Sequence, residues 1–324
     1  MPIKNQDYAT RRTIRRALIT GVRGFTGEYV RDELLQAGYE VHGTLTLSDI
    51  EREPPAEHEH VLDITSVHEC RRIIGTVKPT HIVHLAAISY VAHDIALDMY
   101  RVNVLGALNV LQACIDVGCH PGKVLIASSA NVYGNAAGVI DENVPPAPVN
   151  HYAASKLAME HLARTWSDKL PIVITRPFNY TGRGQSGRFL VPKIVSHFTQ
   201  RRPFVELGNL DVARDFSDVR MVAKAYRALL ESFAVGETVN VCSERPRTLR
   251  EVIAIVREVT GHDPEIRTNR AFVRDNEVKV LVGSAAKLRR LAPAVTPIDF
   301  GDTIRWMCGA GIAVESPLTL EPSP

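Results

Sequence analysis

The sequence of 324 residues predicts an α/β protein with a doubly wound parallel sheet and a smaller C-terminal α/β lobe. Short runs of β-branched residues alternate with longer amphipathic segments from Ile14 onward, which is typical of successive βαβ units. A glycine-rich segment lies at the first expected strand–helix junction, and the alternation breaks up after Asn179. These observations favour one large sheet followed by a second, less regular unit.

Each element of the expected sheet follows from this alternation. Six strands are expected, at 16–20, 40–44, 81–85, 123–127, 172–176 and 238–242. The segments between them place apolar residues at i, i+3, i+4 and i+7, as helices that cover a sheet do. They are 25–38, 66–78, 99–118, 151–169 and 219–232.

The expected division of the chain follows the change in pattern after Asn179. We expect a flexible tail at 1–13, a sheet domain at 14–180 to which 211–243 returns, and a lobe formed by 181–210 and 244–324. Such a lobe belongs at the carboxyl ends of the strands, where open α/β sheets bind their ligands.

Charge and composition exclude several functions. The 38 Lys and Arg residues nearly balance the 36 Asp and Glu residues, whereas binding to nucleic acid or an anionic membrane usually needs a field of one sign. The five cysteines show no metal-ligand or disulfide spacing, and no apolar run reaches the ~18 residues that span a bilayer. We therefore expect a cytoplasmic protein without a metal that binds a small molecule.

The first strand–helix junction carries Gly21, Gly24 and Gly27 in a GxxGxxG arrangement. In a dinucleotide site the first glycine permits a tight turn, the second admits a pyrophosphate, and the third allows close packing of helix on strand. The free amides of the helix N-terminus then face the anion. An ordinary turn is the alternative, but the position in the first βαβ unit favours a dinucleotide.

The end of the second expected strand bears on which dinucleotide binds. NAD sites usually have an acidic residue there, whereas this chain has Thr44, Leu45 and Thr46. Arg23 either meets the 2′-phosphate of NADP or faces solvent, so NADP is favoured and NAD stays open. Asp63 either accepts a hydrogen bond from the adenine amino group or caps the helix that begins near Ser66.

Tyr152 and Lys156 lie four residues apart on an expected helix and therefore share one face. A phenol has a pKa of ~10, and an adjacent ammonium favours the phenolate and brings that pKa toward neutrality. Ser128 and Ser129 follow the strand 123–127, where a hydroxyl can hold a substrate oxygen. A serine, a tyrosine and a lysine after a nucleotide loop predict proton transfer beside a bound cofactor.

With these residues in order, the chain resembles the extended short-chain dehydrogenase/reductase family from about Ile14 to about Leu291. The matching motifs are TGVRGFTG, LDI, HLAA, NVLGALNVL, SSANVYG, YAASK, RPFNYTGRGQ, RDFSDV and NVCSE. The later motifs are most similar to the branch of GDP-4-keto-6-deoxy-D-mannose reductases. The resemblance implies a Rossmann-type domain and a homodimer that pairs through helices 99–116 and 152–166.

The resemblance also implies roles for individual residues. Ser129 anchors the substrate oxygen, Tyr152 is the acid, and Lys156 is its partner. The implied cofactor contacts are Gly21, Arg23, Gly24, Phe25, Thr26, Gly27, Asp63, Ile64, Leu85, Ala86, Ala87, Asn103, Tyr152 and Lys156. The implied substrate contacts are Ser89, Ser129, Asn131, Asn179, Lys193, Arg214 and Arg274.

Ordinary structural roles remain open for three of these cations. Arginine binds phosphate well, so Arg214 and Arg274 suit a nucleoside diphosphate. Arg214 lies among acidic residues and Arg274 next to Asp275, so both can instead form internal ion pairs. Lys193 can equally be a surface lysine.

The expected activity is NAD(P)H-dependent reduction of the C4 ketone of a nucleotide-linked 6-deoxy-4-keto sugar, with GDP as the expected nucleotide, for glycan precursor synthesis. A 4-epimerase that retains NAD uses the same residues and is the alternative. A 4,6-dehydratase ranks lower because Asn131 stands where the dehydratases carry an acidic residue, and an amide cannot act as a general base. A non-catalytic dinucleotide-binding protein ranks last.

Overall fold

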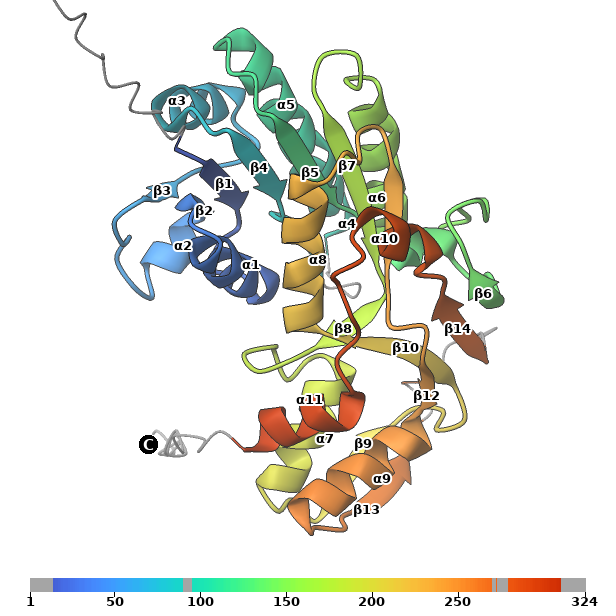
Figure 1. Cartoon of the computed structure of the whole chain (residues 1–324). Helices are drawn as coiled ribbons and strands as arrows, with labels where there is room; N and C mark the ends of the chain where they lie inside the picture. The colour runs from blue at the N-terminus through green and yellow to red at the C-terminus, as the bar shows by residue number, and fades with distance from the viewer. Residues whose placement is uncertain (1–13, 90–94, 270–271, 273–278, 310–324) are drawn as a thin grey trace, which may run out of the picture.

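The computed structural model of the chain describes residues 14–89, 95–269, 272 and 279–309. Figure 1 shows a large sheet between helices, with a smaller lobe below it. The expected tail 1–13 and the expected substrate residue Arg274 lie outside the described residues.

The large sheet has seven parallel strands in the order β11-β7-β5-β4-β1-β2-β3. They are β1 (Arg16–Thr20), β2 (Glu40–Leu45), β3 (Glu59–Val61), β4 (His81–His84), β5 (Lys123–Ala127), β7 (Ile172–Pro177) and β11 (Thr238–Val241). The six expected strands are confirmed, each ending within one residue of its expected end. The seventh, β3, is missing from the prediction because it is only three residues long and two of them are polar.

Helices cover both faces of this sheet, as predicted. On one face α1 (Phe25–Gln36) packs against α8 (Val219–Glu231), and on the other lie α3 (Val67–Val77), α5 (Gly106–Asp116) and α6 (His151–Arg164). In α3 the buried residues are Cys70, Ile73, Ile74 and Val77, the spacing of one helical face. The expected helix 99–118 is instead divided into α4 (Ala96–Tyr100), a π-helical turn η1 (Arg101–Leu105) and α5.

The smaller lobe is built on a five-stranded sheet with the order β12-β10-β14-β6, in which β8 also pairs with β10, and on the pair β13-β9. Its strands are β6 (Gly138–Ile140), β8 (Asn179–Thr181), β9 (Phe204–Leu207), β10 (Ala213–Asp218), β12 (Pro246–Thr248), β13 (Glu265–Thr268) and β14 (Val280–Gly283). Its helices α7 (Leu190–Thr199), α9 (Leu249–Thr260) and α11 (Phe300–Cys308) share a separate apolar core. Short helices α2 (Leu47–Ile50) and α10 (Ala286–Leu291) complete the helices between strands.

The two sheets divide the segment 211–243 between them. Its first part, β10, lies in the sheet of the smaller lobe, whereas α8 and β11 return to the large sheet. The segment 138–140 also contributes β6 to the smaller lobe. We therefore propose a boundary that follows the sheets and assigns β6 and β10 to the lobe.

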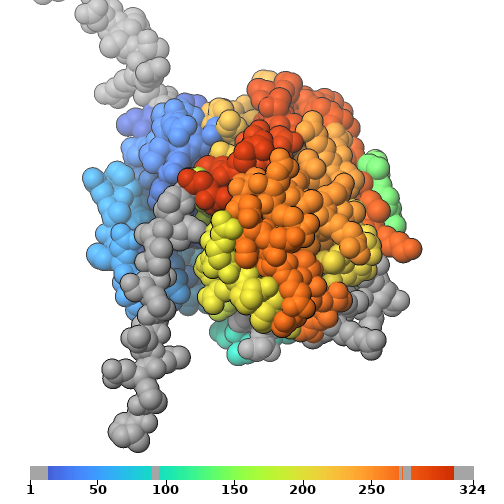
Figure 2. Space-filling view, turned by 90° about the horizontal axis from the view of Figure 1, so that it is seen from below, coloured from blue at the N-terminus to red at the C-terminus, as the bar shows by residue number. Residues whose placement is uncertain are grey.

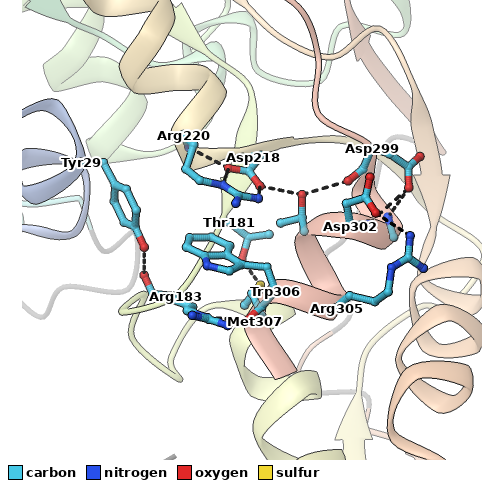
Figure 3. A network of polar contacts seen from close by, with 12 residues as sticks. Tyr29, Thr181, Arg183, Asp218, Arg220, Asp299, Asp302, Arg305, Trp306 and Met307 are labelled. Carbon is cyan, nitrogen blue, oxygen red and sulfur yellow. Dashed lines mark hydrogen bonds and ion pairs between the residues drawn. The ribbon is translucent and has the colours of Figure 1, made fainter. Parts of the chain in front are cut away.

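Helix α11 is attached to the start of α8 by polar and aromatic contacts (Figure 3). Thr303 Oγ1 donates to Asp218 Oδ2 at 2.8 Å. The Arg220 guanidinium, which is paired with Asp218 at 2.6 Å, lies 3.9 Å from the centre of the Trp306 ring. These contacts hold the last described helix against β10 and α8.

A second contact joins the lobe to the first helix of the large domain. The Tyr29 hydroxyl of α1 donates to the Arg183 carbonyl at 2.8 Å, and the Arg183 guanidinium lies 5.1 Å from the Trp306 ring on α11. Seen from below, lobe residues in yellow and orange lie beside the start of the large domain in blue (Figure 2).

The expected roles of the first and third glycines in the turn and in packing are confirmed. Gly21 has a φ of +72°, which L side chains rarely adopt. A Cβ on Gly27 would lie 2.4 Å from the Gly21 carbonyl oxygen, so only glycine lets α1 approach β1 this closely.

We expect Gly27→Ala to lower the free energy of unfolding by about 1–3 kcal/mol, because the added methyl group meets backbone atoms that cannot move away. Gly75→Ala, in helix α3, is the matched control: its Cβ would meet only the Val117 side chain, at an ordinary 3.8 Å, so the variant should be more stable by about 0.5–1 kcal/mol. Urea denaturation of the two variants measures both effects. Equal stability of Gly27→Ala and the unchanged protein would contradict this account of the packing.

Candidate active site

A cleft of about 1700 Å³ runs between the carboxyl ends of the large sheet and the smaller lobe. Most of the residues expected to contact ligands line it. They are Gly21, Arg23, Gly24, Phe25, Thr26, Gly27, Asp63, Ile64, Leu85, Ala86, Ala87, Ser89, Ser129, Asn131, Tyr152, Lys156, Asn179, Lys193 and Arg214. Residues far apart in the sequence therefore meet in one cleft.

One end of the cleft is formed by the glycine loop and the start of α1. Gly24 is the N-cap of this helix of 12 residues and has no side chain to occupy the first amides. Those amides, together with the positive end of the helix dipole, suit a phosphate group. The residues Leu85 to Ser89, which follow β4, also line the cleft, and Ala86 lies next to Gly21.

Asp63 lies at this end and organises its own turn. Its Oδ1 accepts from the backbone N–H of Thr65 at 2.9 Å and from the Thr65 hydroxyl at 2.7 Å. The N-cap of α3 is Ser66, which accepts from the Glu69 N–H. The capping role considered for Asp63 is thus filled by Ser66, and the contact with adenine stays a prediction.

Arg23 is bound to the segment between β2 and β3. Its Nη2 lies 2.6 Å from Glu59 Oε2, and its guanidinium also donates to the carbonyls of Glu53 and Pro54, each at 2.7 Å. The side chain is only 15% exposed, so Arg23 is not the solvent-facing arginine considered as an alternative. The Glu59 carboxylate therefore already neutralises the charge of Arg23.

Sequence reasoning missed another cation at this end, Arg52. It lines the cleft with Thr46 and Ser48, just after β2. Among the described residues we find no ion pair or side-chain hydrogen bond for Arg52. The sequence signal for Arg52 was its position seven residues beyond the end of β2. The path of the turn between them decides whether the Arg52 side chain faces the cleft.

The expected proton-transfer residues meet where β5 ends beside α6. Helix α6 begins at Asn150, whose side chain accepts from the Ala153 N–H at 2.8 Å. Tyr152 and Lys156 share one face of it and are 8% and 3% exposed. Ser129 acts on the Tyr152 phenol by lowering its pKa, and Lys156 Nζ donates to the Ala127 carbonyl at 2.8 Å.

Burial sets the protonation of both groups. Burial raises the pKa of the Tyr152 phenol, and the hydrogen bond with Ser129 only partly opposes it. Burial also lowers the pKa of Lys156 to about 8. The prediction that Lys156 lowers the tyrosine pKa is therefore wrong, because desolvation raises that pKa instead. The neutral phenol is favoured, and this is the form that donates a proton.

The structure separates the two serines that follow β5. The Ser128 hydroxyl donates to Glu160 Oε1 at 2.6 Å. Ser129 Oγ accepts from the Asn131 N–H at 3.1 Å, and Ser129 lines the cleft with Tyr152. The contact of Ser129 with a substrate oxygen stays a prediction.

Asn103 was expected to contact the cofactor, but it lies fully buried and does not line the cleft. Its Oδ1 accepts from the Ile88 N–H at 2.8 Å, and its Nδ2 donates to Ser155 Oγ at 2.9 Å. Asn103 thus supports the wall after β4 from behind. The π-helical turn, which sequence periodicity does not reveal, determines where this side chain points.

Lys193, Arg214 and Asn179 line the lobe end of the cleft. Lys193 Nζ donates to the Glu206 carbonyl at 2.8 Å and lies 4.3 Å from the centre of the Phe272 ring. It is therefore not an isolated surface lysine.

The acidic residues close to Arg214 in the sequence all bind other groups. Asp211 pairs with Arg250 at 2.6 Å, Asp215 accepts from Ser243 at 2.7 Å, and Asp218 pairs with Arg220 at 2.6 Å. Arg214 itself lines the cleft and donates from Nη1 to the Ala213 carbonyl at 2.9 Å, and its contact with an anionic ligand group stays a prediction.

The described residues lack a metal cluster and a membrane-spanning helix. No group of three or more His, Cys, Asp or Glu residues within them could hold a metal ion. None of their helices is long and apolar enough to cross a membrane.

Comparisons of the sequence with known proteins agree with this site. The sequence model of the GDP-mannose 4,6 dehydratase family matches residues 18–293. The chain is 33% identical over 275 residues to the GDP-6-deoxy-D-talose 4-dehydrogenase of Aggregatibacter actinomycetemcomitans, covering 84% of this chain and 89% of that one. It is 32% identical over 287 residues to the GDP-6-deoxy-D-mannose reductase of Pseudomonas aeruginosa, with the same coverage.

Solved structures show the same architecture. A candidate epimerase from Burkholderia cenocepacia is 45% identical, with a TM-score of 0.84 over 91% of this chain and 97% of that one. The structure of RMD from Pseudomonas aeruginosa complexed with NADPH is 28% identical, with a TM-score of 0.78 over 91% of this chain and 98% of that one. The chain belongs to the extended short-chain dehydrogenase/reductase family, within the group described by the GDP-mannose 4,6 dehydratase model.

Proposed function

We propose that this protein reduces the C4 ketone of a GDP-linked 6-deoxy-4-keto hexose with a reduced nicotinamide dinucleotide. The observation that carries the proposal is the meeting of Ser129, Tyr152 and Lys156 between the glycine loop and the lobe that carries Arg214. Relatives named as a GDP-6-deoxy-D-talose 4-dehydrogenase and a GDP-6-deoxy-D-mannose reductase support both the chemistry and the nucleotide.

The side chains supply a proton and hold the ketone oxygen. A bound nicotinamide supplies the hydride that reaches C4. The Tyr152 phenol, neutral because it is buried, gives its proton to the oxygen that becomes the alcohol. Ser129 orients that oxygen, and the Lys156 ammonium stabilises the tyrosinate that remains until solvent returns the proton. Hydride and proton together convert ketone to alcohol.

NADP is the proposed cofactor, and Arg52 the residue that binds its 2′-phosphate. Arg52 lines the cleft end with Ser48, whereas Arg23 is paired with Glu59. The acidic residue at this end, Asp49, accepts from the N–H and hydroxyl of Thr46 at 2.8 and 2.7 Å. A basic side chain with two nearby hydroxyls suits a phosphate better than a ribose hydroxyl.

A 4-epimerase is the second candidate, because it would use the same serine, tyrosine and lysine. The Burkholderia cenocepacia protein, 45% identical, is named as a candidate epimerase. A dehydratase is disfavoured by Asn131, whose amide lines the cleft where a base would be needed. A non-catalytic binding role is disfavoured by the complete set of Ser129, Tyr152 and Lys156.

A second copy of the chain is the proposed partner. Leu97 and Leu105, in α4 and η1, are 67% and 46% exposed, and both elements pack against α6. Burying such apolar side chains against a symmetric copy is the usual way in which a two-fold dimer is stabilised.

We expect the protein to oxidise NADPH when GDP-4-keto-6-deoxymannose is added, and Tyr152→Phe to lower kcat about 10²–10⁴-fold because the proton donor is lost. Loss of reduced-nicotinamide absorbance measures the rate. Tyr39→Phe, which removes a phenol bound to Glu231 outside the cleft, is the matched control and should retain activity. Unchanged turnover in Tyr152→Phe would remove this tyrosine from the mechanism. Tightly bound NAD with sugar conversion but no NADPH oxidation would establish the epimerase instead.

Arg52→Ala should raise the KM for NADPH about 10-fold or more and leave the KM for NADH nearly unchanged, because only NADPH has the 2′-phosphate. Steady-state kinetics with both cofactors tests this. Arg23→Ala is the comparison variant, and it should not discriminate between the two cofactors. The reverse pattern, with Arg23→Ala selective and Arg52→Ala neutral, would transfer the phosphate contact to Arg23.

Light scattering after size exclusion should give about twice the chain mass of 35.8 kDa at micromolar concentration. The double variant Leu97→Asp/Leu105→Asp should give the monomer mass, because charges replace the apolar contact. Leu35→Asp, on helix α1 and 50% exposed, should remain dimeric. A monomeric unchanged protein would refute the proposed dimer.

A further inference from the structure

Helix α6 carries a third ionisable residue on the face of Tyr152 and Lys156. Glu160 lies four residues beyond Lys156, and its side chain is completely buried. A buried carboxylate is costly unless it is paired and hydrogen-bonded. The proposed proton transfer makes no use of it, so its placement needs a separate explanation.

The Glu160 carboxylate is saturated with donors. Oε1 accepts from the Ser128 hydroxyl at 2.6 Å and from Arg176 Nε at 2.8 Å. Oε2 accepts from Arg176 Nη2 at 2.6 Å and from Arg164 Nη2 at 3.0 Å. These donors lower the pKa of Glu160, although burial acts in the opposite direction, so the carboxylate stays ionised beneath the cleft.

The last residue of β5, Ala127, and the two residues after it each interact with one residue on this face of α6. Ala127 accepts from Lys156, Ser128 donates to Glu160, and Ser129 acts on the Tyr152 phenol. The bond from Ser128 to Glu160 thus ties the residue before Ser129 to the helix that carries Tyr152.

Arg176 holds this carboxylate from the neighbouring strand β7. Its guanidinium lies 4.8 Å from the centre of the Tyr133 ring, in the short turn that follows Ser129. The Tyr133 hydroxyl in turn donates to Asn240 Oδ1 on β11 at 2.8 Å. The ion pair thus connects α6, β7 and the turn that carries Ser129.

We propose that Glu160, held by Arg176, is a positioning residue that fixes Ser129 against Tyr152 and keeps Lys156 charged. The kinetic part of this inference rests on the proposed reductase function. No contact between Glu160 and a ligand is required, because the residue acts through Ser128 and through its charge.

The charge effect follows from the groups around Lys156. They are Glu160 on the same helix and His84 on β4, whereas Arg176 on β7 contacts Glu160 and the Tyr133 ring. His84 is neutral because burial lowers its pKa to about 3. Glu160 raises the pKa of Lys156, whereas burial lowers it to about 8.

Removing the negative charge leaves burial unopposed, so the lysine should lose its proton at lower pH. Activity that needs the ammonium is present below this pKa and is lost as the pH rises through it. In the unchanged protein this loss centres near pH 8. Without Glu160 it should move toward lower pH.

Glu160→Gln and the double variant Glu160→Gln/Arg176→Met test the charge, the second without leaving a buried arginine unpaired. The pKa of Lys156 is measured by NMR of [ε-13C]lysine-labelled protein, with the resonance assigned by its absence in Lys156→Met. We expect it to fall by about one unit or more in both variants. The basic limb of the kcat profile should shift equally, while the KM for NADPH changes less than about twofold. An unchanged Lys156 pKa in the folded double variant would overturn the charge role.

Ser128→Ala tests the positioning role separately, because it keeps the ion pair and removes only the hydrogen bond. It should lower kcat about 10-fold without moving the Lys156 pKa. Wild-type kcat in this variant would overturn the positioning role.

Asp218→Asn is the matched control, since it removes another buried carboxylate paired with an arginine, away from the cleft. Asp218→Asn should lower thermal stability but leave the basic limb of the kcat profile unchanged. If this limb shifts as it does in Glu160→Gln, the loss of any buried ion pair produces the shift, and the proposed charge role of Glu160 is wrong. If the unchanged protein does not oxidise NADPH with the sugar nucleotide, the proposed reductase function fails. The NMR titration then still decides whether Glu160 keeps Lys156 charged.

Discussion

The contact between the end of β5 and one face of α6 determines what this protein can do chemically. Ser129 and Tyr152 are separated in the sequence by the turn 130–133 and strand β6, yet the parallel sheet places the carboxyl end of β5 beside the first turns of α6. Because the contact is buried, desolvation governs the protonation of the phenol and the ammonium. A tyrosine that is neutral and a lysine that titrates near pH 8 are consequences of that burial.

The same parallel arrangement explains why the cleft has two chemically different ends. All seven strands of the large sheet point their carboxyl ends in one direction, so the glycine loop and the segments after β4 and β5 open onto one cleft. The helix start at Gly24 suits phosphate, whereas Arg214 and Lys193 arrive from the smaller lobe. Contacts from α11 and from Tyr29 hold that lobe beside the large domain.

Two buried carboxylates in the described part of the chain, Asp218 and Glu160, are each paired with an arginine, and the two pairs have different consequences. Asp218 with Arg220 fastens α8 to α11, where the neighbouring groups are an aromatic ring and a hydroxyl. Glu160 with Arg176 lies beneath a lysine whose charge is needed, so the same kind of pair also acts electrostatically. Buried ion pairs seldom add net stability. Here they restrict the neighbouring helices and strands to one arrangement.

The sequence by itself determined the features that depend on short-range spacing. The six strands, the tight turn at Gly21, the close packing at Gly27 and the shared face of Tyr152 and Lys156 all follow from local periodicity or from the size of one residue. The tertiary structure alone decided which polar groups are free to act. Arg23 is neutralised by Glu59, Ser128 is turned toward Glu160, and Asn103 is placed behind the cleft by a π-helical turn. Each outcome depends on a partner from another element or on a local change in helical repeat, and neither is visible in the order of residue types.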